Sequence, residues 1–156
     1  MKVFIVYDSK YGNTKTVAEN ILEGLKQVEG IEAAIGYAKE VNSQRLVCYD
    51  AFIIGAPNNM GRPTRTIKKF IDRLAELDLK AKHAVVFGTY SGRVRTVDRA
   101  VKKLEKMVEK ALPNLKLISP SLSIRVKGVS GPAVEGELDK CKDFGQRIAN
   151  QLTQEQ

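Results

Sequence analysis

Short apolar runs alternate with amphipathic stretches along this chain. Four runs have the length of strands: residues 3–7, 31–35, 52–56 and 84–88, of which 31–35 is the least apolar. A fifth strand region, residues 115–118 and 122–126, is interrupted at Pro120. A run that is apolar at nearly every position suits a strand with both faces covered, as in a parallel sheet between helices. The pattern therefore predicts an α/β fold.

Between these runs, apolar residues recur at helical spacing. Helices are predicted after residue 14, from Thr64, over residues 94–112 and around 138–148, with a short helix or turn at 42–48. Each carries on one face the apolar side chains that a helix packed on a sheet must bury. No repeat or linker interrupts this alternation, so residues 1–156 are expected to form a single domain.

The first apolar run leads straight into a polar loop. The residues of this loop that we expect to bind a ligand are Ser9, Lys10, Tyr11, Gly12, Asn13 and Thr14. A helix start has N–H groups without intrahelical partners and a partial positive charge, so strand, loop and helix in this order can bind a phosphate. Gly12 lets the backbone approach a ligand closely. An ordinary turn capped by Asn13 or Thr14 is the alternative interpretation.

Better-known phosphate sites are excluded by spacing. The ATP-binding loop needs Lys-Ser or Lys-Thr after its second glycine, and the dinucleotide fingerprint needs three glycines where this loop has only Gly12. A phosphoacceptor receiver domain would need an aspartate at the end of the third strand, where this chain has Ala56 and Pro57. Another kind of phosphate-bearing ligand is therefore expected.

The segment at residues 7–14, YDSKYGNT, resembles the phosphate loop of the flavodoxin family, [ST]-x-[TY]-G-[NT]-T. This resemblance implies a doubly wound, five-stranded parallel sheet in the order 2-1-3-4-5, in a three-layer α/β/α arrangement. It also implies non-covalent flavin mononucleotide (FMN), with its phosphate on this loop.

Two further loops follow the third and fourth predicted strands. The residues expected to bind the flavin ring are Pro57, Asn58, Asn59, Met60, Gly61 and Arg62 after the third strand, and Thr89, Tyr90, Ser91 and Gly92 after the fourth. The resemblance implies that a peptide of the earlier loop reorients when the flavin is reduced, and Gly61, Asn58 and Asn59 tolerate the positive φ that this needs. Tyr90 either stacks on the ring or only lines the pocket. Considered alone, residues 57–63 are equally a plain connecting turn.

The net charge is +8, from 26 Lys and Arg against 18 Asp and Glu, whereas typical flavodoxins are acidic. A solvated basic face is the simplest interpretation. Four arginines flank the ring-side loops: Arg62, Arg65, Arg93 and Arg95. They predict that the reduction potential of the hydroquinone couple is less negative than in an acidic flavodoxin. They also predict redox partner proteins with acidic docking surfaces. The lysines lack the interleaved aromatics of single-strand binding, so no nucleic-acid partner is predicted.

The length of the apolar runs and the cysteine and histidine content limit the possible partners, metals and cellular location. No apolar run approaches the roughly 18 residues of a membrane span, so no membrane partner is predicted. Cys48, Cys141 and His83 lack metal-ligand spacing, so no metal is predicted; the cysteines are expected in the core or on a helix face, as fits a reducing cytoplasm. The chain is expected to be a monomer or weak dimer.

The predicted function is that of an electron carrier. FMN supplies the redox chemistry, so no catalytic side chain is predicted. The alternative is an FMN-dependent NAD(P)H:quinone oxidoreductase on the same fold, which NADH or NADPH would reduce directly.

Overall fold

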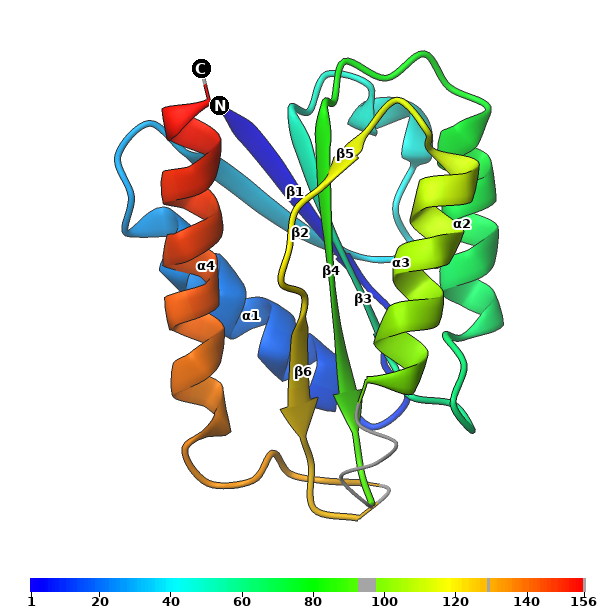
Figure 1. Ribbon diagram of the computed structural model, residues 1–156, viewed down its shortest axis with the longest axis vertical. Helices are drawn as coiled ribbons and strands as arrows, with labels where there is room; N and C mark the ends of the chain where they lie inside the picture. Colours follow the sequence, from blue (N-terminus) through cyan, green and yellow to red (C-terminus); the bar gives the residue numbers. More distant parts are fainter. Residues whose placement is uncertain (93–97, 129, 156) are drawn as a thin grey trace.

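The computed structural model describes residues 1–92, 98–128 and 130–155, and within them a parallel sheet lies between two layers of helices (Figure 1). The strands are β1 (Lys2–Tyr7), β2 (Glu32–Tyr37), β3 (Ala51–Pro57), β4 (His83–Tyr90), β5 (Lys116–Leu117) and β6 (Leu122–Arg125). Their order is β2-β1-β3-β4-β5, and β6 also pairs with β4. The predicted α/β fold and strand order are confirmed, and the fifth strand position is indeed split into two pieces around Pro120.

The helices begin and end close to the predicted positions. They are α1 (Asn13–Lys26), α2 (Arg65–Ala75), α3 (Arg99–Ala111), α4 (Glu137–Gln154) and the short 3-10 helix η1 (Ser43–Leu46). Thr64 caps α2, because its hydroxyl accepts a hydrogen bond from the Ile67 N–H at 3.5 Å. The predicted start of the third helix at residue 94 lies outside the described residues.

Each face of the sheet has its own core. On one face α2 and α3 cover Phe4, Phe52 and Ile54, and on the other α1 and α4 cover Ile5 and Ile53. Neighbouring residues of one strand point to opposite faces, so the continuous apolar runs bury side chains on both. Each fully buried aliphatic or aromatic side chain contributes about 1.5–3 kcal/mol to this arrangement.

Two glycines allow α1 and α4 to approach closely. A Cβ added to Gly24 would lie 2.1 Å from the Lys142 carbonyl oxygen, and one added to Gly145 would lie 2.3 Å from the Ile21 carbonyl oxygen. Both obstacles are backbone atoms, which cannot rotate away. The close crossing brings the residues that precede α4 to the same end of the molecule as the start of α1 (Figure 1).

The two cysteines occupy different environments. Cys141 is fully buried in α4, as expected for a core residue, and burial raises the pKa of its thiol to about 12. The expectation is wrong for Cys48, which is exposed in the turn after η1. Among the described residues, no helix is both long and apolar enough to cross a bilayer.

Candidate functional site

A cleft of about 610 Å³ opens at the carboxyl ends of the strands, where the three predicted loops meet. Most of the predicted site residues line it: Ser9, Lys10, Tyr11, Asn13, Thr14, Pro57, Asn58, Asn59, Met60, Thr89, Tyr90 and Ser91. Gly12, Gly61, Arg62 and Gly92 belong to the same loops but do not line the cleft. Its volume is within the usual 300–1,000 Å³ range of small-molecule sites.

Sequence reasoning missed several lining residues: Asp8, Tyr37, Lys39, Thr64, Thr66 and Val126. Asp8, Thr64 and Thr66 are close in sequence to predicted loops and could have been included on that ground. Tyr37 and Lys39 lie at the end of β2, which is longer than predicted and carries no ligand-binding motif.

The first loop leaves the start of α1 without a side-chain cap. Gly12 occupies the N-cap position with φ +90°, and neither Asn13 nor Thr14 caps the helix, contrary to the alternative of an ordinary capped turn. The Gly12 N–H donates to the Ser9 Oγ at 2.9 Å, and the Ser9 N–H donates to the Asp8 carboxylate at 3.0 Å. The loop thus holds its own shape, and the first-turn N–H groups stay available to an anion.

The side chains at the start of α1 tie this loop to distant segments. The hydroxyls of Thr14 and Thr89 are hydrogen-bonded at 3.0 Å, and both residues are buried. The Asn13 side chain packs on Gly131, where an added Cβ would lie 2.2 Å from the Asn13 Oδ1. The segment before α4, expected from sequence only as a loop, therefore supports the first loop from behind.

Residues 58–62 form a tight hairpin, and its role as a ring-binding loop or a connecting turn stays a prediction. Asn59 and Arg62 exchange two backbone hydrogen bonds of 2.9 and 3.0 Å. Met60 and Gly61 have φ of +53° and +82°, as a type I′ turn requires. Gly61 has the expected positive φ, and the other positive φ falls on Met60 instead of an asparagine.

Asn58 fixes this hairpin against the third loop. Its side-chain oxygen accepts from the Gly61 N–H at 2.6 Å, and its backbone N–H donates to the Thr89 carbonyl at 2.8 Å. In the third loop, the Tyr90 carbonyl accepts from the Val126 N–H at 2.8 Å, and Tyr90 is half-buried at the cleft wall. The stacking role of Tyr90 stays a prediction.

The electrostatics of the cleft come from a few side chains. Burial raises the pKa of Tyr37, and the charge and hydrogen bond of Asp8 act in the same direction. Lys10 lies over the exposed Tyr11 ring at 5.4 Å, at the mouth of the first loop. The predicted cations Arg93 and Arg95 lie outside the described residues.

These features fit FMN. An added Cβ at Gly12 would meet no atom within 4 Å, so the uncapped helix start borders open space that a phosphate can fill. The lining is rich in hydroxyl and amide side chains, among them Ser9, Asn13 and Asn58, which can hydrogen-bond a cofactor. Such a site suits a cofactor that supplies its own chemistry.

Comparison with known proteins agrees with this geometry. The flavodoxin family model matches residues 5–120. A flavodoxin of Aquifex aeolicus is 33% identical over 94 residues, which cover 58% of this chain and about half (51%) of that protein. A flavodoxin of Clostridium saccharobutylicum is 28% identical over 159 residues, covering 99% of both proteins.

The fold comparison also covers nearly the whole chain. The structure of a flavodoxin from the domain Archaea has a TM-score of 0.81 at 23% identity and covers 98% of this chain and 99% of its own. Flavodoxin 2 from Bacillus cereus has a TM-score of 0.79 at 25% identity, covering 97% and 99%. The chain therefore belongs to the flavodoxin family, whose members bind FMN and transfer electrons.

Proposed function

We propose that the cleft binds FMN non-covalently and that the chain carries low-potential electrons between redox partner proteins. The observation that carries this proposal is the uncapped start of α1, which opens into a cleft walled by two further loops. Family membership supports the same function.

Each predicted loop has a share in holding the cofactor. Residues 9–14 would hold the phosphate, because each N–H or hydroxyl bond to a charged acceptor contributes about 1.5–3 kcal/mol. Residues 57–62 and 89–92 would hold the ring between them. The Thr14 and Thr89 hydroxyls already bond to each other, so their main role is to keep the first and third loops together. When bound, FMN supplies the redox chemistry, and the chain binds and orients it.

The comparisons do not favour the quinone reductase alternative, because the curated relatives reported above are flavodoxins. Addition of NADH or NADPH to the FMN-loaded protein distinguishes the two activities. A carrier keeps its oxidised flavin spectrum, whereas a reductase loses it without another protein.

Titration of the apoprotein with FMN and with riboflavin, its phosphate-free analogue, tests the proposed site. Two bonds of about 1.5 kcal/mol to the phosphate already correspond to ~100-fold in affinity, so riboflavin should bind at least that much more weakly. Equal affinity for the two ligands would show that the first loop does not hold the phosphate. No binding of either ligand would refute the function.

The remaining predictions concern the partners, the cellular location, the oligomeric state and the domain organisation of the protein. The net charge of +8 supports partners with acidic docking surfaces. The free thiols of Cys48 and Cys141 support a cytoplasmic location. Only Tyr11, Val47 and Met60 are large exposed hydrophobics among the described residues, which supports a monomer or weak dimer. A single domain over residues 1–156 also stays a prediction.

A further inference from the structure

The cleft contains a buried carboxylate beside the loop that would hold a phosphate. Asp8 lines the cleft although it is only 8% exposed. Among the residues that the structure describes, Asp8 forms no ion pair. A buried negative charge without a cation is costly unless hydrogen-bond donors satisfy it. The donors around Asp8 therefore decide whether a carboxylate is tolerated at this position.

Two donors come from the described part of the chain. The Ser9 N–H donates to the Asp8 carboxylate at 3.0 Å, and the Tyr37 hydroxyl is hydrogen-bonded to it from the end of β2. An ionised carboxylate has about four acceptor positions, so about two remain. Because Asp8 lines the cleft, these positions are open to water or to a ligand.

Asp8 lies between the two parts of the proposed flavin site. Its own N–H donates to the Gly55 carbonyl at 3.1 Å, which holds it beside the end of β3. Ser9, the next residue, begins the loop proposed to hold the phosphate, and Pro57, which ends β3 just beyond Gly55, begins a loop proposed to hold the ring. A chain that links the phosphate to the ring therefore has to pass Asp8.

The parts of FMN differ in what they can offer to a buried carboxylate. The phosphate dianion only accepts hydrogen bonds and repels a second negative charge, so it cannot satisfy Asp8. The ribityl chain between the phosphate and the ring carries hydroxyls, each of which can donate. A hydrogen bond from a hydroxyl to an ionised acceptor is about twice as strong as one to a neutral acceptor. The ribityl chain is therefore the part of FMN that complements Asp8.

We propose that Asp8 determines the specificity of the flavin site for the linking chain, because its carboxylate accepts hydrogen bonds from the hydroxyls of that chain. This inference rests on the proposed FMN function. A linking chain without hydroxyls would displace water from Asp8 and leave the buried carboxylate short of donors. Sites built to bind a hydroxyl reject ligands that lack it for this reason.

The test compares FMN with its phosphopentyl analogue, in which an unsubstituted pentyl chain replaces the ribityl chain while the ring and the phosphate are retained. Flavin fluorescence gives the dissociation constant of each ligand for the apoprotein. Wild type should bind FMN ~10- to 100-fold more tightly than the analogue, as expected for one hydrogen bond to a charged acceptor. In Asp8→Ala this ratio should fall at least about tenfold.

Asp8→Asn keeps the shape of the side chain and removes its charge. The amide oxygen can still accept from the Ser9 N–H, so the first loop keeps this support. Loss of the charge lessens the repulsion of the phosphate equally for both ligands, so this effect cancels in the ratio of dissociation constants. Because a neutral acceptor binds a hydroxyl more weakly, the ratio should lie between those of wild type and Asp8→Ala.

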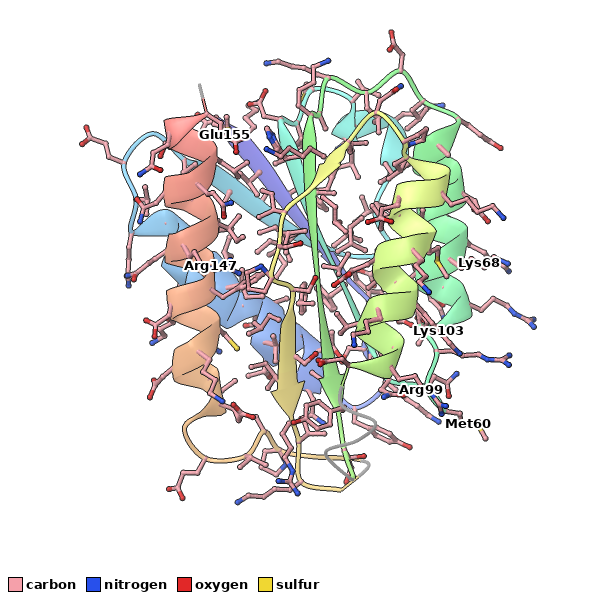
Figure 2. All side chains as sticks on the ribbon, in the orientation of Figure 1. Met60, Lys68, Arg99, Lys103, Arg147 and Glu155 are labelled. Carbon is pink, nitrogen blue, oxygen red and sulfur yellow. The ribbon has the colours of Figure 1, made fainter. Side chains whose placement is uncertain are left out.

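Asp50→Ala is the matched control for lost stability. Asp50 also accepts a backbone N–H, from the first residue of β1 at 2.7 Å, but it precedes β3 at the other end of the sheet. The first residue of β3 pairs with His83, which Glu155 contacts. Figure 2 shows Glu155 and the cleft residue Met60 at opposite ends of the molecule. The ratio for Asp50→Ala should therefore equal that of wild type.

Three results would overturn the proposed role of Asp8. These are equal affinity of wild type for the two ligands, an unchanged ratio in Asp8→Asn and Asp8→Ala, or an equal fall of the ratio in Asp50→Ala. If Asp8→Ala does not fold, the ratio for Asp8→Asn decides. Failure of wild type to bind FMN would refute the proposed function and this inference with it, whereas normal FMN binding with any of the three results would refute the role of Asp8 alone.

Discussion

Gly131→Ala should weaken FMN binding although Gly131 does not line the cleft. An alanine Cβ at this position would lie 2.2 Å from the Asn13 Oδ1 and 2.3 Å from its Nδ2, whereas ordinary contacts begin at 3.4 Å. The Asn13 side chain or the first loop must therefore move by about 1 Å, and overpacking of this kind costs about 1–3 kcal/mol. The displaced Asn13 carboxamide would lose its packing on the segment before α4, so the first loop would lose this support for presenting its N–H groups to the phosphate.

Gly131→Ala should also lower the free energy of unfolding through its backbone conformation, and this effect can be measured separately. Gly131 has φ +81°, where alanine is less stable by about 1–2 kcal/mol. Gly128→Ala is the matched control, because Gly128 also has positive φ, +62°, but an added Cβ there meets nothing within 4 Å. Both variants should lose similar stability from the backbone, and only Gly131→Ala should disturb Asn13.

The assay is FMN titration of each apoprotein, followed by flavin fluorescence, with urea unfolding of the same samples. Loss of one charge-assisted bond to the phosphate, about 1.5–3 kcal/mol, predicts that Gly131→Ala binds FMN ~10- to 100-fold more weakly than Gly128→Ala. Equal dissociation constants for the two variants would refute the support of the first loop by the segment before α4.

Two further predictions concern stability. Gly145→Ala should lower the free energy of unfolding by about 1–2 kcal/mol in urea titrations, because overpacking against the Ile21 carbonyl outweighs the better helix propensity of alanine; unchanged stability would mean that the helices separate freely. Burial would raise the pKa of Asp50, but the Lys2 N–H bond at 2.7 Å and the Lys80 ammonium at 3.1 Å outweigh it and lower the pKa below its usual 3.8. Asp50 therefore stabilises the fold above that pH and loses this effect as the pH falls through its lowered pKa, so Asp50→Asn should be less stable than wild type near neutral pH and equally stable in acid. Thermal unfolding against pH measures the difference, and a gap that persists in strong acid would contradict this account.

The sequence by itself determined the fold and the position of the first loop in it. Apolar runs such as 3–7 and 52–56 specify strands covered on both faces, and alternation with amphipathic helices specifies a parallel sheet. The strands and the helices are both predicted from local periodicity, which can be seen in a single sequence. The predicted binding loops lie together because the carboxyl ends of parallel strands meet at one edge of the sheet.

Only the tertiary structure decided which residues support the site. Thr14 bonds to Thr89, 75 positions away, and Asn13 packs on Gly131. The cleft likewise includes Tyr37 from the end of β2, and Arg99 covers the hairpin. No local sequence pattern predicts these contacts. Each joins residues from different strand–helix units, so it depends on how those units pack against one another. Sequence periodicity specifies which face a residue takes, and the packing of the layers decides which neighbour it meets there.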